Sequence, residues 1–257
     1  MGGALLRGWI EKGVIEFASS AIFDPAPPET VKAQAKTSGI SLNPSIGGAR
    51  FNAIVISIKP QAAADVLPAF APVIGDAAII SIMAGKSVSA IGTAMPGARK
   101  IIRAMPNLPA AIGAGVTALF ATPLVGPGDR AAAERLMSAV GSTIWVESEA
   151  LIDAVTAVSG SGPAYFFLLA EALAEAGVAA GLSVDAAQSL ARATLAGAGA
   201  YAAQEARSLS ELRRAVTSPG GTTEAALKIL DGDGKAMRQL VAKAVEAAKR
   251  RAGELTG

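Results

Sequence analysis

The chain has 257 residues, which is long enough for one large core or for two domains. Hydrophobic residues make up 51% of it but aromatic residues only 4%, and alanine, a strong helix former, supplies much of the apolar content. There is no cysteine and no histidine, which excludes disulfides, thiolate nucleophiles and histidine acid–base catalysis, and we expect no metal site.

The charges indicate neither a nucleic-acid surface nor a membrane anchor. The formal net charge is +2, and the basic residues are scattered except at Lys249-Arg250-Arg251, where they complement a helix dipole. No apolar run approaches the roughly 20 residues that a membrane span needs, and the start does not resemble a signal peptide. We therefore expect a cytoplasmic protein that binds no nucleic acid and no membrane.

Three apolar runs that end at turn residues indicate buried parallel strands. They are residues 51–58, 77–83 and 100–105, which end at Lys59-Pro60, Ala84-Gly85 and Pro106-Asn107. Helical patterns lie between these runs. Residues 115–121 and 142–146 are typical of two further strands around a helix at 128–140, and a looser alternation over 14–23 ends at Asp24-Pro25. The alternation predicts an α/β fold with a doubly wound parallel sheet.

After Glu147 the strand patterns stop and helical patterns follow. We expect helices at 148–158, from Pro163 to about 180, and from Ser183 to about 204, with a break at 159–163. Gly197 and Gly199 predict that another helix packs very close to them. The last helix carries an apolar stripe that faces either a second subunit or an internal core. Its members are Met237, Leu240, Val241, Ala244, Val245 and Ala248.

Residues 216–223, Val-Thr-Ser-Pro-Gly-Gly-Thr-Thr, predict a tight loop that leads directly into a helix. Pro219 fixes one φ angle, and Gly220 and Gly221 permit backbone geometries that other residues resist. Thr222 or Thr223 is placed to cap the helix. Such a loop presents hydroxyls and free N–H groups to a small carboxylate or phosphate. The alternative interpretation is a capped turn between two helices, with no ligand.

Ligands of open α/β sheets bind beyond the carboxyl ends of the strands. Asp24, Lys59-Pro60, Ala84-Gly85 and residues 105–107 all lie at such ends. Each could be an ordinary turn, but four of them followed by a helical domain favour a dinucleotide-dependent enzyme.

Six short segments carry a resemblance to a known enzyme family. They are Met1-Gly2, Ile-Lys-Pro-Gln at 58–61, Ser-Ile-Met-Ala-Gly at 81–85, Met-Pro-Asn-Leu-Pro at 105–109, Ser-Gly-Ser-Gly-Pro-Ala-Tyr at 159–165, and the loop at 216–223. In this order and spacing, across essentially the whole chain, they closely resemble the pyrroline-5-carboxylate reductases, which make proline by reducing a cyclic imine.

The resemblance implies a Rossmann-type dinucleotide-binding domain at 1–147 and an all-helical dimerisation domain at 148–257 that holds the substrate. It implies NADPH or NADH as the hydride donor, 1-pyrroline-5-carboxylate as the substrate and L-proline as the product. It also implies a homodimer, and leaves a larger ring of dimers open.

The resemblance implies two groups of site residues, and the strand ends and the glycine fingerprint support part of the first group. The expected cofactor-binding residues are Met1, Gly2, Asp24, Asn43, Ile58, Lys59, Pro60, Ala84, Gly85 and Asn107. The expected substrate-binding residues are Ser218, Gly221, Thr222 and Thr223, with Thr223 as the catalytic residue that hydrogen-bonds the ring nitrogen. Lys59 has a plainer interpretation as a strand-end charge in solvent.

The start of the chain departs from the family. Met1-Gly2 would be the last two positions of the fingerprint Gly-x-Gly-x-x-Gly, so the first strand and the first two glycines are absent. That strand lies at the centre of such a sheet. We therefore expect the natural protein to begin roughly 10 residues earlier, and we expect weak cofactor affinity and low stability for the 257-residue chain.

Asp24 bears on the choice of cofactor. It follows the presumed second strand, where an acid accepts hydrogen bonds from the adenosine ribose and repels a 2′-phosphate. No arginine follows until Arg50, which favours NADH. The alternative is that Asp24 only forms the Asp-Pro turn.

Two rival functions fit the same layout. A β-hydroxyacid dehydrogenase usually requires a lysine base in the helical domain, and the chain has no lysine between Glu147 and Arg214. A non-catalytic nucleotide-binding protein would have no need of the complete loop at 216–223. Both observations favour the reductase.

Overall fold

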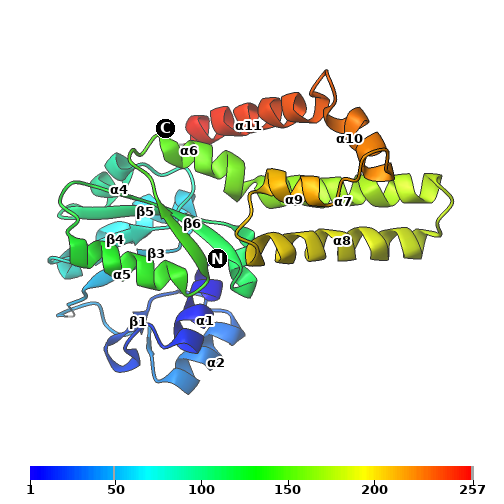
Figure 1. The fold of residues 1–257 in the computed structure, drawn as a ribbon. Helices are drawn as coiled ribbons and strands as arrows, with labels where there is room; N and C mark the ends of the chain where they lie inside the picture. The colour runs from blue at the N-terminus through cyan, green and yellow to red at the C-terminus, as the bar shows by residue number, and fades with distance from the viewer. Residues whose placement is uncertain (49, 256–257) are drawn as a thin grey trace. The chain divides into compact units, whose positions relative to one another are not determined.

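The computed structural model describes residues 1–48 and 50–255 (Figure 1). The chain forms two compact units: residues 1–160 together with the end of the chain from Ala248, and residues 161–247. The first of these units ends at residue 160, whereas the expected boundary follows residue 147. The last turns of the C-terminal helix, from Ala248 on, also belong to the first unit. The expected domain boundary stays a prediction.

The first unit is built on a five-stranded sheet of order β3-β4-β5-β6-β7. Its strands are β3 (Ala53–Ile56), β4 (Ala78–Ser81), β5 (Lys100–Pro106), β6 (Gly115–Ala121) and β7 (Gly141–Trp145). β3, β4 and β5 are parallel, and so are β6 and β7, but β5 and β6 run antiparallel. The sequence predicts all five strands but not this reversal. Only residues 107–114 join β5 to β6, which is too short for the crossover that a parallel pair needs.

A separate sheet pairs β1 (Ala21–Ile22) with β2 (Ser41–Leu42) in parallel. The prediction for residues 14–23 is therefore only partly right, because Phe17–Ser19 form a 3-10 turn, η1, and the paired stretch is short. β2 was not predicted, since two residues show no alternation. Among the described residues no strand connects β1 to β3, so the sheet is split at this point. The first strand expected there stays a prediction.

Helices and short turns connect the strands of the first unit. Its helices are α1 (Gly2–Lys12), α2 (Glu29–Ser38), α3 (Ala63–Val66), α4 (Val88–Ala94), α5 (Pro127–Ser138) and α6 (Leu151–Val155). The 3-10 turns are η2 (Pro60–Ala62), η3 (Leu67–Val73) and η4 (Leu108–Ile112), and a π-helical segment, η5 (Thr156–Gly160), follows α6. The break expected at 159–163 is thus a change of helix type and not an open loop.

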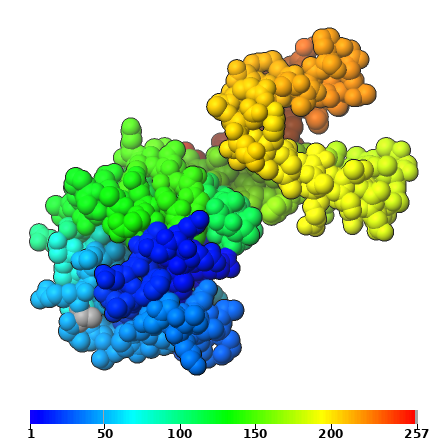
Figure 2. Space-filling model, turned by 60° about the horizontal axis from the view of Figure 1, so that its bottom comes forward, coloured from blue at the N-terminus to red at the C-terminus, as the bar shows by residue number. Residues whose placement is uncertain are grey.

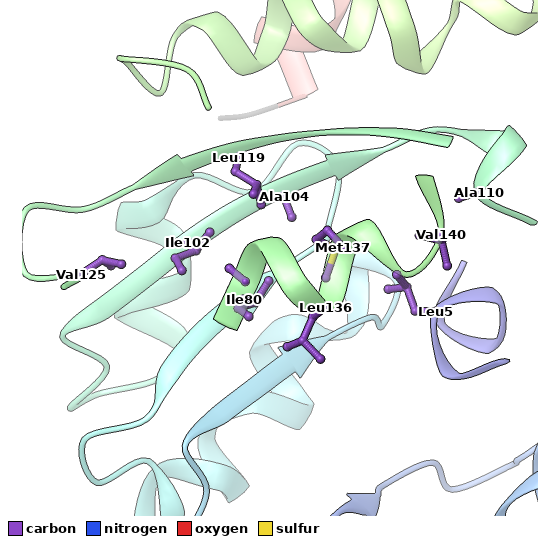
Figure 3. Packing of buried hydrophobic residues seen from close by; sticks show 11 residues of the cluster. Leu5, Ile80, Ile102, Ala104, Ala110, Leu119, Val125, Leu136, Met137 and Val140 are labelled. Atoms are coloured by element: carbon purple, nitrogen blue, oxygen red, sulfur yellow. The ribbon is translucent and has the colours of Figure 1, made fainter. Parts of the chain in front are cut away.

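Two apolar layers cover the sheet because successive side chains of each strand point to opposite faces. Ile80 and Ile102 point to the face covered by α1 and α5, where they pack with Leu5, Leu136 and Met137 (Figure 3). Their neighbours Ile79 and Ile101 point to the other face. That face is covered by α3, η3 and α4, through Ala63, Leu67, Ile91 and Met95. The result is a three-layer α/β unit, as predicted.

Helix α1 lies against both α2 and α5 (Figure 2). Leu5 is fully buried in the core of the sheet, while Leu6 packs with Val31 of α2. The indole N–H of Trp9 donates a 2.8 Å hydrogen bond to the carbonyl of Leu136. These contacts hold the N-terminus of α1 at a defined place beside the sheet.

The second unit is helical. It contains α7 (Gly162–Ala179), α8 (Val184–Gln204), α9 (Leu209–Ala215), α10 (Thr222–Asp231) and most of α11 (Ala236–Leu255). α7 and α8 lie side by side (Figure 1). Their approach is close at Gly177, where an added Cβ would lie 3.3 Å from the Cβ of Ala187. Nothing lies within 4 Å of a Cβ added at Gly197 or Gly199, so the close neighbour expected there is not in the described part of this chain.

Many large apolar side chains of the second unit are exposed. Phe166, Phe167, Leu168 and Leu169 of α7 are between 46% and 64% exposed, and Leu240 of α11 is 70% exposed. By length and composition alone, the helical stretch Leu151–Ala179 could also cross a membrane, since an 18-residue window within it has a mean hydropathy of 1.2. No single uninterrupted apolar run reaches this length, and length and composition alone do not distinguish a membrane span from a core helix. The expectation of no membrane binding stays a prediction.

Candidate functional site

The carboxyl ends of three parallel strands meet at one edge of the first unit's sheet. β3 leads to Ile58, Lys59 and Pro60, and β4 leads to Ala84 and Gly85. Ile58 is half-buried against the apolar face, while Lys59 is exposed. Gly85 has a φ of 66°, which favours glycine, and a Cβ there would lie 2.8 Å from the carbonyl oxygen of Leu255. This edge therefore brings together five of the expected cofactor residues.

Asn107 follows β5 at the same edge. Its side chain is buried, and its amide oxygen accepts a 2.9 Å hydrogen bond from the N–H of Val116 on β6. The carbonyl of Asn107 also accepts from the N–H of Ala110. The side chain therefore shapes the turn between β5 and β6, a structural role that the sequence did not indicate.

Asp24 and Asn43 lie together at the carboxyl ends of β1 and β2. The amide of Asn43 pairs with the backbone of Asp24: its oxygen accepts from the N–H of Asp24 at 2.8 Å and its NH₂ donates to the carbonyl at 2.7 Å. Oδ1 of Asp24 accepts from the N–H of Ala26 at 2.9 Å. Asp24 therefore does form the Asp-Pro turn, and its other carboxylate oxygen makes no hydrogen bond within the described residues. Asn43 orients Asp24.

The N-terminus of α1 lies beside the end of β3. A Cβ added at Gly2 would lie 2.6 Å from Oγ of Ser57, so a larger residue here would force the side chain of Ser57 to move. Met1 occupies the N-cap position and no side chain caps the helix. The first N–H groups of α1 therefore stay available, and a helix start with free N–H groups favours an anion.

The expected substrate residues lie in the second unit, on the loop between α9 and α10. Thr217 closes α9, because its hydroxyl donates a 2.7 Å hydrogen bond to the carbonyl of Arg213. Gly220 has a φ of 70°, and its N–H donates to Oε2 of Glu224 at 2.7 Å. The N–H of Gly221 donates to the carbonyl of Ser218 at 3.0 Å. The loop is therefore folded by its own backbone and by Glu224.

The N-cap of α10 is Gly221, and Thr222 and Thr223 are the first residues inside the helix. The expected threonine cap is therefore wrong, because the loop closes one residue earlier than the hydroxyl pattern indicates. Within the described residues, the hydroxyls of Ser218, Thr222 and Thr223 make no protein hydrogen bond. Ser218 and Thr222 are exposed and Thr223 is half-buried. A helix start with uncapped N–H groups and free hydroxyls can bind a small carboxylate.

Glu224 is the charged group closest to this loop in sequence. The Gly220 N–H, and then the positive charge of Lys228, lower the pKa of Glu224 below its ordinary value. The carboxylate is therefore ionised at neutral pH and holds Gly220 in place. The contact between Glu224 and Gly220 was not predicted from the sequence.

Arg103 and Glu149 form a partly buried ion pair that the sequence analysis also missed. Nη1 of Arg103, whose side chain is 4% exposed, lies 3.0 Å from Oε1 of Glu149. The signal was present: Arg103 lies between apolar residues inside the strand at 100–106, and a charge buried there requires a partner. The partner could not be identified from sequence, because it lies far along the chain.

Comparison with known proteins agrees with this geometry. The family model described as pyrroline-5-carboxylate reductase dimerisation matches residues 149–255. A pyrroline-5-carboxylate reductase of Pseudomonas aeruginosa is 44% identical over 79% of this chain and 74% of its own length. One from Haemophilus influenzae is 34% identical over 99% of this chain and 94% of its own.

The chain belongs to the pyrroline-5-carboxylate reductase family.

Solved structures of the family have the same fold. A pyrroline-5-carboxylate reductase from Coxiella burnetii superposes with a TM-score of 0.89 at 33% identity, over 99% of this chain and 94% of that one. The Plasmodium falciparum pyrroline carboxylate reductase, solved with NADP bound, gives a TM-score of 0.80 at 27% identity, over 100% and 95%. These structures confirm the predicted fold class, which is a Rossmann-like sheet followed by a helical dimerisation domain.

The expected site residues therefore fall into two groups in this family member. The cofactor candidates all lie in the first unit: Ile58, Lys59, Pro60, Ala84, Gly85 and Asn107 follow the ends of β3, β4 and β5, Asp24 and Asn43 are paired at the ends of β1 and β2, and Met1 and Gly2 lie at the start of α1. The substrate candidates gather on one loop of the second unit. No comparison tests their individual roles, which stay predictions.

Proposed function

We propose that this chain reduces the cyclic imine of 1-pyrroline-5-carboxylate to L-proline, the last step of proline biosynthesis. The observation that carries this is the extent of the likeness: 34% identity to a pyrroline-5-carboxylate reductase over 99% of the chain. The alternatives to this function are a β-hydroxyacid dehydrogenase and a non-catalytic nucleotide-binding protein, and a reductase assay distinguishes the three.

The chain's residues fit a nicotinamide dinucleotide. The uncapped start of α1, with Gly2 close against Ser57, suits a pyrophosphate. Ile58, Lys59, Pro60, Ala84 and Gly85 line the neighbouring edge of the sheet, where dinucleotides bind in such folds. NADH or NADPH, when bound, supplies the hydride. The residues at this edge hold the dinucleotide and exclude water.

The loop at 216–223 holds the substrate in this proposal. The N–H groups at the start of α10 and the hydroxyls of Ser218 and Thr222 bind the carboxylate. The Thr223 hydroxyl hydrogen-bonds the ring nitrogen and orients the ring. A protonated imine is already a strong electrophile, so positioning contributes most of the catalysis and no histidine is needed. When the imine arrives protonated, the hydride alone completes the reduction to the amine, and Thr223 need not supply a proton.

Asp24 supports a preference for NADH over NADPH. Its backbone is fixed by Asn43 and one carboxylate oxygen is free of hydrogen bonds within the described residues. A carboxylate at the end of β1 accepts from a ribose hydroxyl and repels a 2′-phosphate. Comparison of kcat/KM for the two cofactors checks this preference, and a strong preference for NADPH would contradict it.

The exposed apolar surface of the second unit supports a homodimer. The family model for dimerisation spans this unit, and the side chains of α7 that it covers are largely exposed in the single chain. A groove lined by Leu227, Leu230, Met237 and Val241 adds to that surface. A second copy of the chain would cover both. This assembly also accounts for the apolar stretch 151–179 in a cytoplasmic enzyme that binds neither membrane nor nucleic acid.

The test is a reductase assay on the purified chain. Addition of 1-pyrroline-5-carboxylate should oxidise NADH or NADPH, followed by the fall in cofactor absorbance, and should yield an equal amount of proline. A β-hydroxy acid with the oxidised cofactor is the matched control and should give no reaction. Cofactor binding without any turnover would show a non-catalytic binder, and turnover of the β-hydroxy acid alone would show the dehydrogenase.

A further inference from the structure

One carboxylate oxygen in the first unit joins three elements. Oε1 of Glu149 accepts a 3.0 Å hydrogen bond from Nη1 of Arg103 and a 2.7 Å hydrogen bond from the backbone N–H of Val88. Arg103 lies on β5, Val88 is the first residue of α4, and Glu149 lies two residues before the start of α6. The contact therefore ties the start of α4 to a strand inside the sheet.

The loop between β4 and α4 is fixed at both of its ends, and the contact with Glu149 contributes to the second. Its first end continues β4, which pairs with a neighbour on each side. Its second end is Val88, where Oγ of Ser87 caps the helix by accepting from the N–H of Ala90 at 3.1 Å. Ala84 and Gly85, two of the expected cofactor residues, lie between these ends.

Arg103 holds the carboxylate of Glu149 in a fixed position. It lies on β5, which pairs with β4 on one side and β6 on the other, and its side chain is 4% exposed. A buried guanidinium needs a partner with opposite charge, so Glu149 is held firmly on it. Glu149 in turn is 32% exposed and reaches the backbone of Val88.

We propose that Glu149 is a positioning residue for the cofactor loop at 84–87, with Arg103 as its anchor. This rests on the proposed function, since it takes that loop to contact the dinucleotide. Glu149 acts through the N–H of Val88 and touches neither cofactor nor substrate. A loop held in its binding conformation binds more tightly, because less order must be gained on binding.

The test separates this role from stability by two matched variants. Arg103→Met combined with Glu149→Leu removes both charges, and such replacements of ion pairs by apolar side chains are often neutral for stability. It also removes the acceptor of the Val88 N–H. We expect a melting temperature close to that of the wild type, about tenfold faster hydrogen exchange at Val88, and about tenfold weaker NADH binding.

Glu149→Gln makes the opposite change. The amide oxygen can still accept from Val88, but the charge that balances Arg103 is lost. We expect a lower melting temperature while Val88 exchange and NADH affinity stay within about twofold of the wild type. The proposal would be overturned if NADH affinity fell in parallel with the melting temperature across these variants. It would also be overturned if the double variant bound NADH as tightly as the wild type, and the ion pair would then be purely structural.

Failure of the proposed function is a different result. A wild-type chain that binds NADH in a way that depends on Glu149, but does not reduce 1-pyrroline-5-carboxylate, would refute the reductase and keep this role for Glu149. A wild-type chain that reduces the substrate, with unchanged NADH affinity in the double variant, would refute only the role of Glu149. A chain that binds neither NADH nor NADPH would overturn both.

Discussion

The backbone N–H of Gly220 donates a 2.7 Å hydrogen bond to Oε2 of Glu224. Gly220 has a φ of 70°, so the loop turns at this residue, and Glu224 lies in the first turn of the helix that follows. The side chain therefore reaches back and closes the loop on which Ser218, Thr222 and Thr223 lie. The turn at Gly220 therefore depends in part on this carboxylate, beside the loop's own backbone hydrogen bonds.

This dependence predicts a titration of the loop in acid. The pKa of Glu224 is lowered from an ordinary value of 4.5, first by the Gly220 N–H and then by Lys228. The contribution of a lowered pKa is fully present above the ordinary value and is lost as the pH falls through the lowered one. We expect the amide chemical shift of Gly220 to be constant above about pH 5 and to titrate below it. In Glu224→Gln the shift should be flat, and a persistent titration would assign it to another group.

Thr223 is the expected catalytic residue, and its hydroxyl is free of protein partners in the part of the chain described. We expect Thr223→Ala to lower kcat/KM by about tenfold or more, the effect of losing a hydrogen bond to a charged group. NADH affinity, measured by cofactor fluorescence, should stay nearly unchanged. Thr223→Ser keeps the hydroxyl and is the matched control, with activity close to the wild type. Activity of the alanine variant within a few-fold of the wild type would mean that the loop is only a turn.

Gly85 and Gly39 give a matched pair for the cofactor edge. Both have positive φ, 66° and 78°, but a Cβ at Gly85 would lie 2.8 Å from the carbonyl oxygen of Leu255, while one at Gly39 would meet nothing within 4 Å. Gly39→Ala should cost about 1 kcal/mol of unfolding free energy from backbone strain alone. Gly85→Ala should cost more, because the backbone of Leu255 must also move. Denaturant unfolding measures both, and equal losses would argue against the Leu255 contact.

Phe167 tests the assembly. Its side chain is 54% exposed within the region that matches the dimerisation model, whereas Ile144, 56% exposed on β7, lies outside that region. A buried charge at an apolar interface is costly, so Phe167→Glu should weaken the dimer. Ile144→Glu should leave it intact. Light scattering during size-exclusion chromatography gives the mass of each variant, and an undiminished dimer in Phe167→Glu would place the interface elsewhere.

Local patterns were enough to predict the strands and the long helices. The largely apolar runs at 77–83 and 100–105 identify β4 and β5, because a strand buried on both faces is apolar at most of its positions. The parallel sheet predicts where its ligands bind, since the carboxyl ends of its strands share one edge. The two-residue strand β2, the antiparallel turn from β5 to β6, and the π-helical segment after α6 leave no periodic signal in the sequence.

The sequence by itself determined the fold class and the family, because both rest on short segments whose chemistry is local. It also predicted two groups of site residues, whose roles stay predictions. Only the tertiary structure decided which side chains are engaged by the protein itself. Asn43 orients Asp24, Asn107 shapes the turn to β6, Glu224 closes the loop at Gly220, and Glu149 joins Arg103 to Val88. Most of these partners are distant in sequence, and a hydrogen bond depends on distance and direction in space, which residue order does not specify.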